Sequence, residues 1–135
     1  MKKVSLIILG LLCVTAVLAQ SLVSNDKPVN PLRSATFAWT QTTFDFGKIK
    51  ANAPVTHEFK FTNSGDSPLV ITSVQASCGC TVAEYSKDPI PSGAQGFVKA
   101  TYNAAKVGVF TKTVTINSNT DAGVVLLTIK GEVIN

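Results

Sequence analysis

In residues 55–62, VTHEFKFT, mainly apolar side chains alternate with polar ones. The side chains that share one face of the extended chain are those of Val55, His57, Phe59 and Phe61. A period of two is typical of a strand in an antiparallel sheet, with one face on a core and the other in water. Asn63-Ser64-Gly65-Asp66 follows and predicts a turn in which Gly65 can adopt a positive φ.

The chain outward from this strand repeats the same kind of pattern. Short runs of β-branched and aromatic residues are separated by Gly, Pro, Asn and Asp, and no stretch sustains the period of a helix. The predicted strands are residues 35–44 (with a break near Thr42), 55–62, 69–75, 81–85, 96–102, 110–118 and 124–134. About seven strands favour an all-β fold, an immunoglobulin-like sandwich of two antiparallel sheets, over a barrel.

Apolar side chains suffice for a core without a long-range disulfide. The chain has 135 residues, of which 45% are hydrophobic and 15% charged, which predicts one folded domain. The expected core side chains are Phe44, Phe46, Phe59, Phe61, Val70 or Ile71, Val74, Phe97, Val114, Ile116, Leu127 and Ile129. Each contributes about 1.5–3 kcal/mol when fully buried.

Residues 1–19 predict a cleaved signal peptide. Lys2 and Lys3 precede an apolar run, and cleavage is expected between Ala19 and Gln20. The run is shorter than the ~20 residues that span a bilayer, so no membrane span is expected after cleavage. The alternative of a lipoprotein acylated at Cys13 is disfavoured by its position inside the run. Export is expected to place the protein in the periplasm, at the cell surface or outside the cell.

Two segments are expected to follow the signal peptide, a flexible spacer at residues 20–34 and the sandwich domain at residues 35–135. Pro28 and Pro31 and the lack of periodicity indicate the spacer. Removing Lys2 and Lys3 lowers the net charge from +4 to +2. Such a weak charge disfavours nucleic acid as a partner.

Cys78-Gly79-Cys80 is the grouping whose spacing most restricts the chemistry. Two Cα atoms two residues apart in a strand are roughly 6.5–7 Å apart, near the limit for a disulfide, so a bridge requires a bend that Gly79 permits. The alternatives are a structural disulfide, a redox-active dithiol, a Cu(I) site at the two thiolates of Cys78 and Cys80, and inert free thiols.

No catalytic residues are predicted. His57 is expected on the core-facing side of its strand or at its margin. The sequence has no nucleophile elbow and no phosphate-binding glycine loop, and its carboxylates are isolated. These features predict a protein that is not an enzyme and needs no cofactor apart from the possible copper.

Four stretches resemble a bacterial family of secreted domains of unknown function. They are FDFGKI at residues 44–49, HEFKFTNSGDSPL at 57–69, SCGCT at 77–81 and KGEV at 130–133. The family is related in fold to the immunoglobulin-like modules shared by Hydin and the major sperm protein. The resemblance implies a sandwich in the envelope of a Gram-negative cell and supplies no catalytic residues.

The sequence thus predicts a non-catalytic, exported binding or scaffolding module that acts through loops or a sheet edge. The expected partner is another envelope protein, held by β-strand augmentation at an edge such as residues 124–134. The alternative function is Cu(I) binding or thiol redox chemistry at Cys78 and Cys80.

Overall fold

The computed structural model describes residues 33–135. The predicted signal peptide, the cleavage site at Ala19 and Gln20, and residues 20–32 of the predicted spacer lie outside the described residues. The described part is all-β, and none of it forms a helix that is long and apolar enough to cross a membrane. Its strands are β1 (Phe37–Trp39), β2 (Thr43–Lys50), β3 (Val55–Asn63), β4 (Ile71–Ala76), β5 (Thr81–Tyr85), β6 (Gln95–Tyr102), β7 (Gly108–Ser118) and β8 (Val124–Ile134).

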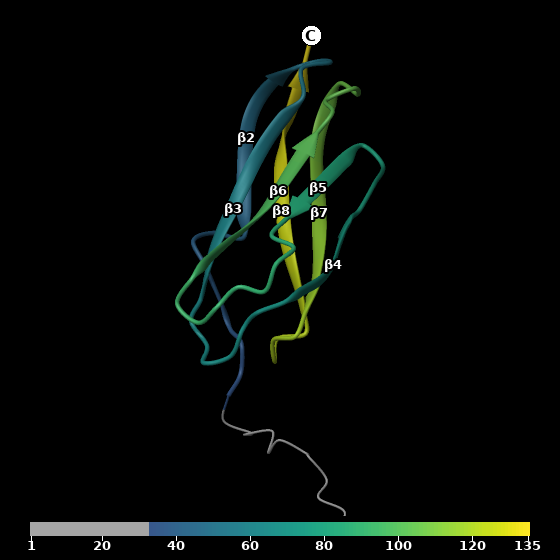
Figure 1. Ribbon diagram of the computed structural model, residues 1–135. Coiled ribbons are helices and arrows are strands. Elements are labelled where there is room, and N and C mark those ends of the chain that lie inside the picture. The colour runs from purple at the N-terminus through teal and green to yellow at the C-terminus, as the bar shows by residue number, and fades with distance from the viewer. Residues whose placement is uncertain (1–32) are drawn as a thin grey trace, which may run out of the picture.

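Two sheets of four strands pack face to face, which confirms the predicted sandwich (Figure 1). One sheet has the order β1-β3-β6-β5 and the other the order β2-β8-β7-β4. Every neighbouring pair is antiparallel except β2 and β8, which run parallel. The prediction of wholly antiparallel sheets was wrong at this pair.

The predicted first strand, residues 35–44, is two strands, so the sandwich has eight strands rather than seven. The chain crosses from one sheet to the other between Trp39 and Thr43 and keeps its direction. As a result β1 pairs antiparallel with β3, whereas β2 pairs parallel with β8. A bulge between Asp45 and Lys48, where Gly47 has a φ of 66°, interrupts the alternation and hid the continuation of β2 to Lys50 from the sequence pattern.

The core lies between the sheets and matches most of the predicted list. Its largest fully buried side chains are Phe59, Phe61, Leu69, Val98, Val114, Ile116, Leu127, Ile129 and Val133. Ile71, rather than Val70, is buried, and Phe44, Phe46 and Val74 pack on the core from its margin. Phe97 was predicted wrongly: β6 buries Val98 and Ala100, and the Phe97 ring lies on the outer face, 5.1 Å below the Lys99 ammonium group.

One end of the sandwich is held together by a buried asparagine. The Asn63 side chain is completely buried and donates from Nδ2 to the carbonyl oxygens of Ser67 (2.7 Å) and Ile90 (3.0 Å). Its Oδ1 accepts from the amides of Gly65 (3.0 Å) and Thr36 (3.3 Å). The sequence indicated only a turn here, yet this side chain connects the start of β1 to the loops on both sides of the core.

Candidate functional site

The Cys-Gly-Cys stretch forms the corner at which the chain passes from β4 in one sheet to β5 in the other. Ser77 anchors its first half, because its amide donates to the carbonyl of Thr113 (2.8 Å) and its Oγ accepts from the Thr113 amide (3.1 Å). The Asn103 amide donates to the Cys80 carbonyl (3.0 Å) and anchors its second half. The backbone therefore fixes the corner on both sides of the two cysteines.

The sulfur atoms of Cys78 and Cys80 lie at bonding distance, and their Cα atoms are 5.3 Å apart. This spacing is shorter than that of an extended strand, so the chain bends here as expected. Gly79 lies within the bend that it was predicted to permit. Its φ is not positive, and a Cβ at this position would meet no atom within 4 Å. The bend therefore requires no glycine, and the disulfide itself stays a prediction.

The geometry gives the Cu(I) alternative no additional ligand. Within residues 33–135, no group of three or more His, Cys, Asp or Glu side chains is placed to hold a metal ion. His57 belongs to β3, and β6 separates that strand from β5. Copper binding at Cys78 and Cys80 therefore stays a prediction that rests on the two thiols alone.

A bridge between Cys78 and Cys80 is expected to add little to the stability of the fold. The chain-entropy relation gives about 1.6 kcal/mol for a ring of three residues, against about 3 kcal/mol for a 15-residue loop. Urea unfolding with and without reductant measures the difference. The Cys78→Ser/Cys80→Ser variant is the control and should not respond to reductant, and a reductant effect above about 3 kcal/mol would contradict the prediction.

His57 lies at the margin of the core, as expected, and stacks on an aromatic side chain. Its ring is parallel to that of Phe44, with 3.6 Å between the ring centroids, and it meets the Phe59 ring edge-on. Gln41 Nε2 donates to His57 Nε2 over 2.8 Å, which fits a neutral imidazole. Burial lowers the pKa of His57 from its ordinary value of 6.5, and the nearby Glu58 opposes this shift.

The lowered pKa of His57 predicts that the domain loses stability on mild acidification. The unfolded chain takes up the proton first as the pH falls below 6.5, so the free energy of unfolding should decrease between about pH 7.5 and pH 5. The chain has one histidine, so His57→Phe, which preserves the stacking, should flatten this dependence. Urea unfolding at a series of pH values tests it, and an unchanged slope in the variant would refute it.

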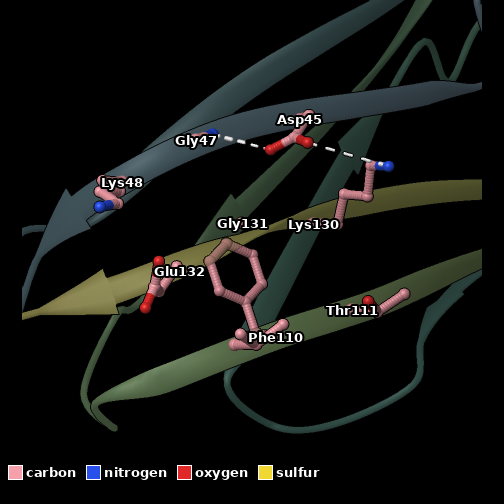
Figure 2. A pocket seen from close by; sticks show the side chains of 9 residues that line it. Asp45, Gly47, Lys48, Phe110, Thr111, Lys130, Gly131 and Glu132 are labelled. Carbon is pink, nitrogen blue, oxygen red and sulfur yellow. Dashed lines mark hydrogen bonds and ion pairs between the residues drawn. The ribbon is translucent and has the colours of Figure 1, made fainter.

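A shallow cavity of about 310 Å³ opens on the outer face of the second sheet, over β2, β8 and β7 (Figure 2). The Asp45 carboxylate accepts from the Gly47 amide (2.8 Å) and lies 3.8 Å from the Lys130 ammonium group. The Phe110 ring and the Gly47 carbonyl group can lie close to the backbone of β8 because residue 131 is a glycine. A Cβ at this position would lie 2.9 Å from the ring and 2.8 Å from the carbonyl oxygen. FDFG at residues 44–47 therefore forms the bulge of β2, and KGE at residues 130–132 supports it. This structural role accounts for both stretches.

A second, more apolar cavity lies on the side of the sandwich where the chain crosses between the sheets. We call it the Trp39 slot; it has a volume of about 220 Å³. Its lining residues are Ala35, Thr36, Phe37, Trp39, Thr120, Asp121, Ala122 and Val125. It thus lies between β1 of one sheet and the β7–β8 turn of the other.

Two hydrogen-bond donors beside the slot have no partner within residues 33–135. Trp39 Nε1 is buried and makes no hydrogen bond. The Thr128 amide donates to the Thr42 carbonyl on the β2 side (2.8 Å), and β2 pairs with β8 only from Thr128 onward. Since alternate amides of a strand point the same way, the Leu126 amide faces this side with no strand next to it. Leu126 is also 56% exposed.

The slot was not predicted from the sequence, although Trp39 lies within the predicted first strand and the last strand was expected to offer an edge. The slot forms because β1 and β2 belong to different sheets, which leaves the beginning of β8 unpaired, and this crossing was not predicted. A tryptophan just before an expected strand break was the available signal.

The fold and this edge define the class of protein: an immunoglobulin-like β-sandwich with an incompletely paired sheet. A model of the family described as a protein of unknown function (DUF1573) matches residues 37–133, and the chain belongs to that family. This agrees with the resemblance to a family of unknown function noted from the sequence. No curated protein matches the chain.

Solved structures share the fold at low sequence identity. A protein of unknown function from Porphyromonas gingivalis W83 has a TM-score of 0.66 and 17% identity, over 75% of this chain and 48% of that one. The chain thus spans about half of that protein. A PapD-like domain of human CEP192 has a TM-score of 0.63 and 8% identity, over 76% and 87%. The YadV chaperone has a TM-score of 0.54 and 11% identity, over 73% and 52%.

Proposed function

We propose that this protein is an exported, non-catalytic binding module of the cell envelope, which takes up an extended segment of another envelope protein as an added strand beside β8. The observation that carries the proposal is the unpaired beginning of β8. Among residues 33–135 the Leu126 amide has no partner, and it lies next to the apolar Trp39 slot.

An extended segment would satisfy this edge in two ways. A backbone carbonyl group of the segment would accept from the Leu126 amide, which has no neighbouring strand on that side within residues 33–135. A side chain facing inward would fill the slot between Phe37 and Val125. Backbone bonds give affinity and the slot gives selectivity, as in other domains that recognise peptides by adding a strand.

The other edges of the two sheets offer less to a partner. β1 has three residues and β5 has five, and β4 has six and is irregular between Ile71 and Ser73. β2 is bulged and carries Lys48 and Lys50 on its exposed side. Short, bulged and lysine-bearing edges are the usual means of preventing strand addition. The similarity to PapD-like domains and to the YadV chaperone supports a fold suited to protein binding.

Substituting Leu126 tests the proposal. Leu126→Pro removes the free amide and leaves the bonds to β7 in place, because proline is tolerated where an edge amide has no partner. Leu126→Ala removes the side chain and keeps the amide, and is the matched control. In pull-downs from envelope extracts, the unaltered domain and Leu126→Ala should retain the same protein, and Leu126→Pro should bind it at least about tenfold more weakly.

Two results would count against the proposal. Equal capture by Leu126→Pro would move the binding site away from this edge, and no reproducible partner at physiological salt would oppose a binding function. Overlapping peptides that cover the sequence of a captured protein are then tested for binding. One of them should bind the unaltered domain and should bind Leu126→Pro more weakly.

A further inference from the structure

We propose that Cys78 and Cys80 form an accessible disulfide that is transferred to a pair of thiols on another protein. Cys78 is the residue whose sulfur bonds to the partner during this exchange. The activity goes beyond the proposed function, because it uses the corner between β4 and β5 and not the edge of β8. Three features of the corner carry the proposal: its accessibility, the small ring that the bridge closes, and a cationic residue opposite Cys78.

The corner offers its sulfur atoms to a second protein. It lies at the outside of the sandwich, where the chain turns from β4 to β5 (Figure 1). Cys78 and Cys80 are half-buried, Gly79 between them is exposed, and a Cβ on Gly79 would meet no atom within 4 Å. Of the two cysteines, Cys80 packs against the core formed by residues 33–135 and Cys78 does not. A thiolate of another chain therefore reaches Cys78 more directly.

The pair can be reduced without opening the fold. A bridge between residues two apart closes a ring of three residues, which removes little chain entropy from the unfolded state. The backbone holds the corner independently of the sulfur atoms, since the Ser77 amide donates to the Thr113 carbonyl (2.8 Å) and the Asn103 amide donates to the Cys80 carbonyl (3.0 Å). Because reduction sacrifices little stability, the equilibrium with a partner's thiols favours the reduced corner more than it would for a long-range disulfide.

A lysine lies opposite Cys78 in the strand register. The hydrogen bonds between Ser77 and Thr113 continue the antiparallel pairing of β4 and β7, and the next pair in this register is Cys78 and Lys112. The Cβ atoms of residues opposite each other are about 4.5–5.5 Å apart, which is within reach of a lysine side chain. Lys112 is half-buried and makes no ion pair with a carboxylate of residues 33–135. Its charge is therefore available to the Cys78 sulfur.

A hydroxyl group adds to this effect. Thr81 is buried, and its Oγ1 lies 3.8 Å from Cys78 Sγ, so that it can donate to the sulfur. A neighbouring ammonium group and a hydroxyl donor both favour the thiolate of a cysteine over the thiol. They stabilise Cys78 in the reduced pair, and a stabilised thiolate is also the better leaving group in disulfide exchange.

The transfer takes two steps. A thiolate of the partner attacks Cys78 Sγ and forms a mixed disulfide, while the Cys78–Cys80 bond breaks with its electron pair on Cys80, which takes up a proton. The second thiolate of the partner then attacks the partner's sulfur in the mixed disulfide, and Cys78 leaves as a thiolate opposite Lys112. The partner loses two electrons and gains a disulfide, and the cysteine pair gains the two electrons. Of the partner's two thiol protons, one passes to Cys80 and the other to the solvent.

Equilibration with glutathione tests the direction of the transfer. In the chain from Gln20 onward, Cys78 and Cys80 are the only cysteines. Alkylation and intact mass in buffers of reduced and oxidised glutathione should give an equilibrium constant for reduction at least about a thousandfold larger than that of a typical structural disulfide. A reduced synthetic peptide whose own disulfide closes a longer loop should become oxidised in equal amount. A constant in the range of structural disulfides, or thiols that stay unpaired in oxidised glutathione, would overturn the proposal.

Variants test the roles of Cys78 and Lys112. The thiol of Cys78 in Cys80→Ser should react with oxidised glutathione at least about tenfold faster than the thiol of Cys80 in Cys78→Ser. Added to Cys80→Ser, Lys112→Met should slow the reaction about three- to tenfold, and Lys112→Arg should retain the rate. Lys87→Met, beyond the far end of β5, is the control and should leave it unchanged. Equal rates for the two thiols would overturn the assignment of Cys78, and an unaffected rate in Lys112→Met would overturn that of Lys112.

Discussion

Replacing Asn63 with aspartate is expected to destabilise the domain by about 3–5 kcal/mol. The substitution retains the oxygen that accepts from Gly65 and Thr36, but it places a second carboxylate oxygen against the carbonyl groups of Ser67 and Ile90. A completely buried carboxylate facing two acceptors has no compensating donor. Such a loss is a large part of the 5–15 kcal/mol that typically stabilises a domain.

Asn119 provides the matched control. It makes the same kinds of bond, accepting from the Val70 amide (2.8 Å) and donating to the Pro68 carbonyl (3.0 Å), but at an exposed position. Asn119→Asp should therefore cost about 1 kcal/mol or less, because water solvates the new charge. Urea unfolding monitored by Trp39 fluorescence measures both variants. Equal losses would show that burial of Asn63 does not decide the cost.

Acid should partly rescue the Asn63→Asp variant. A protonated carboxyl group can donate one of the two lost hydrogen bonds and removes the buried charge. The variant's deficit relative to the unaltered domain should therefore become smaller as the pH is lowered. A deficit that stays constant with pH would indicate that packing, and not charge, accounts for the loss.

Replacing Gly65 with alanine is expected to cost about 2–4 kcal/mol, because the added Cβ would overlap backbone atoms and not a movable side chain. It would collide with the Ser34 carbonyl oxygen and lie 2.7 Å from the Thr36 amide. To relieve the overlap, the start of β1 must move away from the turn. This movement weakens the bonds from the Ser64 and Asp66 amides to the carbonyl groups of Thr36 (3.0 Å) and Ser34 (2.9 Å).

Gly79→Ala is the control, since a Cβ at Gly79 meets no atom within 4 Å and its φ is not positive. It should change stability by less than about 1 kcal/mol. Gly65→Ala should also alter Trp39 fluorescence in the folded state, because β1 lines the slot. If both alanine variants had the same stability, the close approach of the Ser34 and Thr36 backbone would not be the reason for glycine at position 65.

The turn at residues 63–66 illustrates how far local sequence predicts structure. The residue types correctly indicated a turn after β3, since Asn, Ser, Gly and Asp favour one. The reason given for Gly65 was wrong, because its φ is not positive. Gly65 is needed for the approach of Ser34, which lies 31 positions earlier. Propensity reports only on the residue itself, so it could not show which distant backbone would come close.

The faces of the strands were predictable to different degrees. β3 alternates strictly, and a shift of one residue would expose Phe59 and Phe61, so its buried face was evident. In β6, Phe97 shares its face with Lys99 and Thr101, so the alternation favoured burial of the other face, and the prediction of Phe97 rested on the size of its ring alone. The structure accordingly places Val98 and Ala100 against the facing sheet.

Alternation and turn residues act over a few positions, so they sufficed to predict the all-β class, most of the core and the bend at Cys78 and Cys80. The packing of the two sheets, in contrast, decided that β1 and β2 enter different sheets, that β2 runs parallel to β8, and that Asn63 is buried. It also decided where the Trp39 slot lies. These features depend on which strands meet in the sandwich. Pairing between strands that are distant in the sequence produces no periodic pattern within either strand.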